Sequence, residues 1–338
     1  MGLEERVRAM GTGEVGLRFV DDAGRSLAEF PVGARGDGLT AELEILRGAL
    51  ARILVESCDD AVTFAYGMRI ASVEQDEAAV TVSFTGGERR RYDLLVVAEG
   101  IRSTTRDAVF SGEPDYRDLG FYTAYCTIPR TADDDRWWRW YSAIGGRSVH
   151  LRPDNVGTTR ACLNFLCAPT GIDLLDRDAQ VLALRDVYAD VGNAAPRVLS
   201  GLAGDPASLY LDRIAQVRMP SWSRGRVAVL GDAAYCATPI SGMGTSLALI
   251  GAYVLAGELA QHDDHTAGFR AYERRMRPIV DEAQKLPPGV PRIANPTSRI
   301  GVWTLRRAVR VAAAAPVRAL VARLSSAKTA ARLPEYSC

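Results

Sequence analysis

The sequence contains 338 residues, of which 47% are hydrophobic and 24% are charged, with 41 lysines and arginines against 41 aspartates and glutamates. This length corresponds to about two domains, and the apolar fraction is sufficient for a hydrophobic core, which excludes a mainly disordered chain. A net charge of zero lacks the basic surface that binding to a phosphate backbone requires, which excludes a typical nucleic-acid-binding protein.

The cysteines and histidines indicate no metal site. Six cysteines are scattered without a C-x-x-C pair, and the three histidines are His150, His262 and His265. We interpret the last two as part of a solvated connection between helices. Few cysteines in a chain of this size are typical of a cytoplasmic protein with reduced thiols. The longest apolar run, 247–257, is shorter than the roughly 20 residues that cross a bilayer, so we expect a buried helix and no membrane contact.

The first third of the chain shows short alternating patterns. Apolar spacing and turn residues predict a helix ending near residue 10, a hairpin of strands 16–20 and 26–30, and an amphipathic helix over 45–55 with Arg47 in its first turn. Three antiparallel strands are expected at 62–65, 70–73 and 79–84, followed by a fully buried strand at 94–98.

The remaining chain predicts a β-rich layer and then an α/β core. Strands are expected at 121–128, 148–151, 160–167, 209–219 and 226–230, with helices near 179–188, after Gly244 and beyond 267. A strand, a glycine turn and a helix in that order favour a doubly wound α/β fold. Prolines between 287 and 296 predict a linker, and the Arg-rich segment 306–323 predicts a surface helix.

One dinucleotide-binding motif matches by letters alone. Residues 11–16 read G-T-G-E-V-G, but that motif requires a buried strand before it and a helix after it. Here a charged helical fragment precedes the glycines and a strand follows them. We therefore expect a simple entry into the hairpin.

The strongest chemical signal is the segment 225–234, which ends in Gly231 and Asp232. A carboxylate at the end of a buried strand lies where doubly wound sheets bind ligands, and it can accept a hydrogen bond from a ribose hydroxyl. Gly242 and Gly244 permit close approach of backbone amides to a planar ligand, and the helix behind them favours negative charge. The alternative is an ordinary strand-to-helix turn with a capping aspartate.

A second segment, 93–106, repeats this pattern. It predicts a buried strand followed by Glu99 and Gly100, with Ser103 available as the N-cap of a helix. Alone, this turn is a weak signal, but two such strand ends in one chain reinforce each other.

The two motifs, their order and Arg47 resemble the flavin-dependent aromatic hydroxylases, which are single-component FAD monooxygenases of the p-hydroxybenzoate hydroxylase fold. The sequence is most similar to the tetracycline-inactivating and antibiotic-tailoring members, over nearly the whole chain. The resemblance implies that the cofactor-binding residues are Arg47, Glu99, Gly100, Gly231, Asp232, Pro239, Gly242, Gly244 and Thr245.

This resemblance implies an FAD-dependent enzyme that hydroxylates an aromatic or polyketide-like small molecule with NADPH and oxygen. The cofactor would carry out the chemistry, so we assign no catalytic acid or base. Tyr122, Trp140 and Phe165 are candidate substrate residues, with a place in the hydrophobic core as the alternative. A catalytically silent relative that binds a ligand or partner is the competing hypothesis.

The sequence departs from the family pattern at three points. Glu99 stands where the family has aspartate, Met243 where it usually has glutamine, and the opening βαβ unit has no counterpart. We expect the natural reading frame to begin upstream with that unit, or part of the cofactor site to be lost. The predicted domains are 1–118 with 208–285 for FAD, 119–207 for substrate, and a C-terminal helical segment 286–338.

Overall fold

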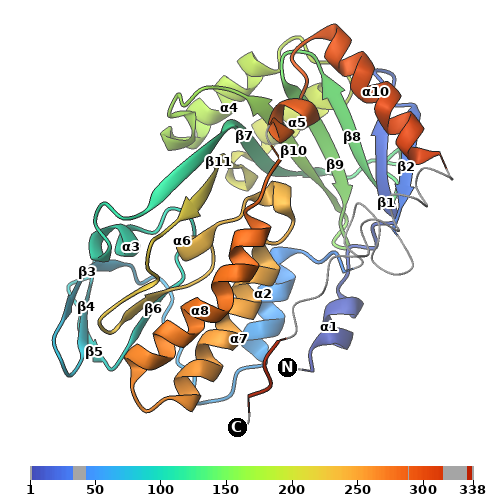
Figure 1. The fold of residues 1–338 in the computed structure, drawn as a ribbon. Helices are drawn as coiled ribbons and strands as arrows, with labels where there is room; N and C mark the ends of the chain where they lie inside the picture. The colour runs from blue at the N-terminus through green and yellow to red at the C-terminus, as the bar shows by residue number, and fades with distance from the viewer. Residues whose placement is uncertain (1, 33–42, 288, 315–332, 337–338) are drawn as a thin grey trace. The chain divides into compact units, whose positions relative to one another are not determined.

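A computed structural model describes residues 2–32, 43–287, 289–314 and 333–336. They form two compact units (Figure 1). The first unit comprises the described parts of 1–63, 120–213 and 289–329, and the second comprises those of 64–119, 214–288 and 330–338. Each unit has its own hydrophobic core.

A seven-stranded sheet forms the centre of the first unit, in the order β11-β7-β10-β9-β8-β1-β2, and residues 115–119 of β7 and 214–218 of β11 are assigned to the second unit. Its strands are β1 (Gly16–Val20), β2 (Ser26–Pro31), β7 (Asp115–Pro129), β8 (Trp137–Ala143), β9 (Arg147–Pro153), β10 (Thr158–Leu166) and β11 (Tyr210–Arg218). β1 pairs antiparallel with β2 and parallel with β8. The predicted hairpin is therefore confirmed, and it belongs to this sheet.

The strand register sorts side chains onto the two faces of this sheet. Trp140 pairs with His150, His150 with Cys162, and Cys162 with Tyr125. Because paired residues point to the same side, these side chains share a face. We call it the polar face, and it carries Thr123, Tyr125, Trp138, Trp140, Ser148, His150, Arg152, Cys162 and Asn164.

The opposite face, called the helix face, packs against α4 (Arg177–Val187) and α5 (Ala195–Gly204) (Figure 1). Leu163 from the sheet, Leu184 from α4 and Leu202 from α5 are each fully buried in this core. Burial of such side chains contributes roughly 1.5 to 3 kcal/mol each, so this layer fixes the sheet.

Helix α10 (Arg299–Ala313) lies against β1 and β2 on the side of the polar face. Its Val309 packs with Leu17 and Phe30. These two residues are paired in β1 and β2, and along each strand they alternate with residues that point to the helix face, so they lie on the polar face. Arg306 donates two hydrogen bonds to the carboxylate of Asp22, at 2.8 and 2.9 Å. The shorter helices of this unit are α1 (Glu4–Ala9), α2 (Arg47–Glu56) and α9 (Val290–Ala294).

The second unit contains two three-stranded sheets, ordered β12-β13-β6 and β3-β4-β5. Their strands are β3 (Ile70–Gln75), β4 (Val80–Phe84), β5 (Arg89–Tyr92), β6 (Leu95–Val97), β12 (Ser223–Arg224) and β13 (Val227–Val229). The helices are α3 (Thr104–Val109), α6 (Asp232–Tyr235), α7 (Gly244–Gln261) and α8 (His265–Ala283). His262 and His265 flank the short connection from α7 to α8, as predicted.

Two strand predictions are wrong in detail. Residues 62–65 are not a strand, and Val62 and Phe64 are exposed, because their alternating pattern has no partner strand. The strand at 94–98 was expected to be fully buried, but β6 ends the order of its sheet and Val96 is 41% exposed. Strand β5 was not predicted because three successive arginines conceal it.

The two units also differ from the predicted domain division. Residues before 64 group with the β-rich layer, because β1 pairs with β8 along its whole length. The predicted surface helix 306–323 is described only to residue 314, and the remainder lies outside the described residues. Among the helices that the structure describes, none combines the length and apolar character needed to span a membrane.

Candidate functional site

The two acid and glycine turns lie next to each other in the second unit. β6 and β13 are parallel, with Leu95 paired to Val227 and Val97 to Val229. The amide of Leu230 donates to the carbonyl of Val97 at 2.9 Å. Both strands therefore end at the same sheet edge, where doubly wound sheets bind ligands.

Arg106 joins these two turns. Its side chain is fully buried, and its guanidinium donates to the carbonyl of Ala233 at 3.0 Å and to that of Ile101 at 3.0 Å. It also donates to Asp107 at 2.8 Å and to the hydroxyl of Tyr116. The guanidinium of Arg106 thus binds the backbone carbonyl of the residue that follows each acid and glycine motif. This role was not predicted from the sequence, where the signal for it is an arginine in the first helical turn after an acid and glycine motif.

Glu99 has a structural role in its own turn. Its carboxylate accepts hydrogen bonds from Ser103 Oγ at 2.6 Å and from the amide and hydroxyl of Thr105 at 3.1 and 2.8 Å. Ser103 caps α3, as predicted, by accepting from the amide of Arg106 at 3.1 Å. Gly100 has a φ of +82°, which favours glycine. The assignment of Glu99 and Gly100 to the cofactor stays a prediction.

Asp232 lies beside the start of α7. Gly231 adopts φ 65° and ψ −142°, and the exposed Asp232 follows it as the first residue of α6. A methyl group added at Gly244 would lie 3.8 Å from Oδ1 of Asp232. The carboxylate and the glycine loop predicted to contact the cofactor are therefore neighbours.

The loop before α7 leaves the first turn of that helix without a side-chain cap. A short 3₁₀ turn covers Pro239–Ser241, Gly242 is left-handed at φ 65°, and Met243 occupies the N-cap without a capping hydrogen bond. The 18-residue helix begins at Gly244, followed by Thr245. Uncapped amides at a long helix N-terminus favour an anionic or electron-rich group, which fits the predicted flavin contact.

Thr238 begins this loop in a strained conformation. It has φ 79° and ψ 155°, a region that residues with a Cβ rarely adopt, and it is 3% exposed. Its Oγ1 is buried and has no hydrogen-bond partner among the described residues. Strain of this kind costs about 1 to 3 kcal/mol and concentrates at functional loops.

Replacing Thr238 with glycine is expected to raise the free energy of unfolding by about 1 kcal/mol, because the relief of strain and of an unpaired hydroxyl exceeds the entropic cost of glycine. Thr238→Val keeps the strain and is the matched control, expected to give a smaller gain. Urea unfolding measures both. A glycine variant less stable than the valine variant would disprove the strain.

Arg47 lies in the first unit, in the first turn of α2. Its guanidinium is 6.0 Å from the ring centroid of Tyr125, on the polar face. Burial raises the pKa of the Tyr125 hydroxyl, which therefore stays neutral. The structure places Arg47 beside an aromatic side chain of the β-rich layer, and its flavin contact stays a prediction.

The three candidate substrate residues lie on different faces of the sheet. Tyr122 and Phe165 belong to the helix face, where their rings stack at 5.4 Å. The hydroxyl of Tyr122 accepts a hydrogen bond from the amide of Thr170 at 3.0 Å. Trp140 lies on the polar face, beside His150. The structure therefore places the three candidate substrate residues on two different faces of the sheet.

The polar face also carries a partly buried ion-pair cluster that was not predicted from the sequence. Arg152 donates to Glu14 at 2.8 Å and pairs with Glu44 at 3.0 Å. Its guanidinium lies 4.4 Å from the ring centroid of Trp138. Burial raises the pKa of Glu14, and the hydrogen bond and charge of Arg152 oppose that rise. The alternation of polar residues along β9 is the signal that finds this face.

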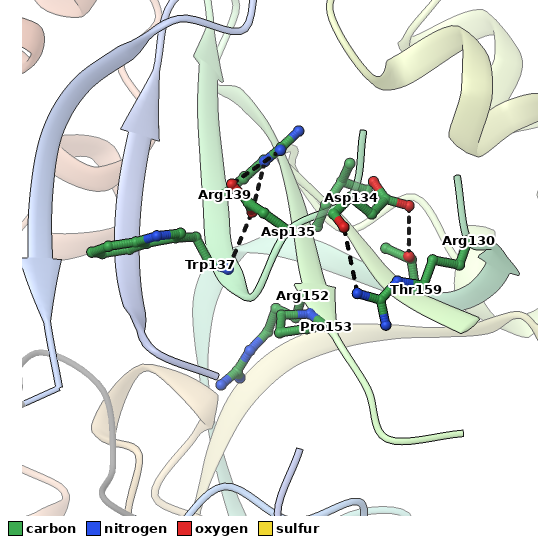
Figure 2. A pocket seen from close by; sticks show the side chains of 9 residues that line it. Arg130, Asp134, Asp135, Trp137, Arg139, Arg152, Pro153 and Thr159 are labelled. Carbon is green, nitrogen blue, oxygen red and sulfur yellow. Dashed lines mark hydrogen bonds and ion pairs between the residues drawn. The ribbon is translucent and has the colours of Figure 1, made fainter. Parts of the chain in front are cut away.

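A hollow of about 10 Å³, room for about one water molecule, lies at one end of the sheet. Figure 2 shows the side chains that line it. It is lined by Arg130, Asp134, Asp135, Trp137, Arg139, Leu151, Arg152, Pro153 and Thr159. A larger cavity of about 260 Å³ on the helix face has Val20, Tyr141, Val149 and Leu151 among its lining residues. The hollow in Figure 2 is too small for a substrate.

Asp134 is the charged centre of this end of the sheet, and its side chain is 7% exposed. Burial acts to raise its pKa, but hydrogen bonds from Arg197, Thr131 and Thr159 outweigh burial and lower it to about 2. The carboxylate therefore stabilises the fold above the unfolded pKa of 3.8, and this stabilisation disappears as the pH falls toward 2.

Asp134→Asn is accordingly expected to lower the free energy of unfolding by about 1 to 2 kcal/mol at neutral pH and to flatten its fall between about pH 4 and pH 2. Asp133→Asn, at the exposed neighbouring position, is the control and should change neither the free energy of unfolding at neutral pH nor its fall between about pH 4 and pH 2. Urea unfolding at several pH values tests this. Equal behaviour of the two variants would contradict it.

Comparisons with known proteins agree with this geometry. The sequence profile of a family described as FAD binding domain matches residues 1–285. The flavin-dependent monooxygenase eupH of Phoma sp is 36% identical over 337 residues, which cover 90% of this chain and 78% of the relative. A flavin-dependent monooxygenase of an unknown prokaryotic organism is 38% identical over 288 residues, covering 84% and 74% of the two chains.

Solved structures share the fold. The tetracycline destructase Tet(51) superposes with a TM-score of 0.80 at 29% identity, covering 99% of this chain and 85% of its own. Klebsiella pneumoniae HpxO, complexed with FAD and uric acid, gives a TM-score of 0.72 at 24% identity, covering 94% and 82%. The second likeness shows the fold alone, and it confirms the predicted α/β architecture with a large sheet and C-terminal helices.

Proposed function

Because this chain belongs to the family of FAD-dependent monooxygenases, we propose that it hydroxylates an aromatic or polyketide-like small molecule with NADPH and dioxygen. The observation that carries the cofactor part is the pair of neighbouring turns at the ends of β6 and β13, joined by Arg106. FAD, when bound, supplies the redox chemistry with which such enzymes use dioxygen.

The residues of the second unit fit an FAD molecule. Asp232 offers an exposed carboxylate that can accept from a ribose hydroxyl. The loop from Pro239 to Thr245 offers glycine backbone and uncapped helix amides, which stabilise negative charge on a flavin ring. The proposed contact of Arg47, in the first unit, with the flavin is based on the resemblance to the family.

The polar face of the sheet is the proposed substrate surface. It combines the indole of Trp140, the imidazole of His150 and the hydroxyl of Tyr125 with few free charges, since Glu14 and Glu44 neutralise Arg152. Such a surface suits a large aromatic molecule with several oxygens. The tetracycline destructases among the structural relatives support a polyketide-like substrate.

FAD titration of the purified chain, followed by NADPH oxidation with and without tetracycline, tests this function. We expect saturable quenching of flavin fluorescence and a faster loss of NADPH absorbance when tetracycline is present. Asp263→Ala, at an exposed position far along the sequence from both motifs, is the control variant. Ligand binding without any flavin binding would instead support the silent-relative hypothesis and contradict the proposal.

A further inference from the structure

Three aromatic rings with N–H groups form one cluster on the polar face. The rings of Trp138 and Trp140 are 5.7 Å apart, and His150 lies 4.0 Å from Trp140 and 5.7 Å from Trp138. Phe19 stacks on Trp140 at 5.4 Å. Since Trp140 contacts both Phe19 and His150, its ring is fixed in place by its neighbours.

Neighbouring side chains settle which nitrogen of His150 carries the proton. Thr123 donates to Asn164 Oδ1 at 2.7 Å, which directs the amide nitrogen of Asn164 toward His150 Nε2 at 3.1 Å. Ser148 lies 3.0 Å from the same nitrogen, but its hydroxyl donates to Asn295 Oδ1 at 2.8 Å. Nε2 therefore accepts, and the proton of the neutral ring is on Nδ1.

His150 is neutral, because burial and then the nearby charge of Arg152 lower its pKa to about 3. No described residue accepts a hydrogen bond from its Nδ1. The Nε1 atoms of Trp138 and Trp140 are buried and likewise have no partner in the described part of the chain. Buried N–H groups almost always have an acceptor, so the two indole donors, with Nδ1 of His150 in the same cluster, point to an acceptor supplied from outside the chain.

We propose that Trp138, Trp140 and His150 form a subsite that donates hydrogen bonds to adjacent keto or phenolate oxygens of the ligand. This subsite rests on the proposed function, and it specifies which chemical groups of the substrate the protein would recognise. Glu14 and Glu44 already bind Arg152, so the described side chains of the subsite offer neutral donors and no free cation. An oxygen of a ketone or a delocalised phenolate fits such donors better than a phosphate does.

Tetracycline is the probe, because it carries keto and phenolic oxygens along one edge. Its binding is measured by calorimetry on the full chain and on three variants. His150→Gln keeps a group at the Nε2 position to pair with Asn164 and removes the Nδ1 donor. His150→Asn keeps an N–H near the Nδ1 position and breaks the pairing with Asn164. Trp140→Phe keeps the aromatic ring and removes one donor.

We expect His150→Gln and Trp140→Phe each to weaken tetracycline binding by about tenfold, the loss of one hydrogen bond, and His150→Asn to stay within about threefold of the original chain. A purely structural role for His150 reverses the order of its two variants, because glutamine preserves the network and asparagine breaks it. That reversal, or equal losses, overturns the proposal.

Two further outcomes separate this inference from the proposed function. If tetracycline does not bind to the original chain, the subsite proposal is wrong, whereas the FAD titration tests the proposed function independently. Binding of tetracycline without binding of FAD refutes the proposed function and leaves the subsite intact. Circular dichroism of each variant must match that of the original chain, and Trp138→Phe replaces any variant that fails to fold.

Discussion

Replacing Arg106 with methionine is expected to destabilise the second unit by about 3 to 5 kcal/mol. The guanidinium is fully buried and donates to the carbonyls of Ala233 and Ile101 and to Asp107. Methionine has similar volume but no donor, so these acceptors lose a buried partner. Because the two carbonyls belong to the two motif turns, FAD affinity should fall along with stability.

Urea unfolding and FAD titration test this prediction. Arg117→Met, at an exposed position on β7, is the control and should change the free energy of unfolding by less than about 0.5 kcal/mol. Arg106→Lys keeps the charge, but its ammonium group cannot donate to both carbonyls as the planar guanidinium does. Its free energy of unfolding should therefore lie between those of the original chain and the methionine variant. A methionine variant as stable as the control would show that the two turns do not depend on this bridge.

Replacing Asp232 with alanine is expected to weaken FAD binding by about 10- to 100-fold while leaving the fold intact. The carboxylate is exposed at the carboxyl end of β13 and lies beside Gly244. A hydrogen bond to a charged acceptor contributes about 1.5 to 3 kcal/mol, which corresponds to that range of affinity.

Fluorescence titration of FAD measures the loss, with Asp263→Ala as the matched control at an exposed aspartate in the connection before α8. The control should bind within about twofold of the original chain. If Asp232→Ala also binds normally, the carboxylate has no role in holding FAD and the turn is an ordinary strand-to-helix connection.

The sequence predicts the local elements of this fold better than their environment. Glycine and aspartate around residues 21–24 predicted the hairpin, but nothing in its sequence shows that β1 pairs with β8. Residues 62–65 alternate like a strand and remain unpaired, because a strand needs a partner that lies elsewhere in the chain.

The candidate site shows the same limit. The paired turns were predictable, because an apolar strand is followed by an acid and a glycine at both places, as Glu99-Gly100 and as Gly231-Asp232. Which aromatic residues face a ligand was not predictable, since a single step along a strand moves a side chain to the other face. Trp140 lies on the polar face, whereas Phe165 lies in the core of the helix face.

The most direct test of the central claim is the fate of oxygen. The chain, supplied with FAD, NADPH and isotope-labelled dioxygen, is incubated with tetracycline, and the product is analysed by mass spectrometry. The proposed function predicts a product that carries one labelled oxygen atom and forms only when both FAD and NADPH are present. Unlabelled tetracycline as the sole species, or labelled product that forms without FAD, would contradict it.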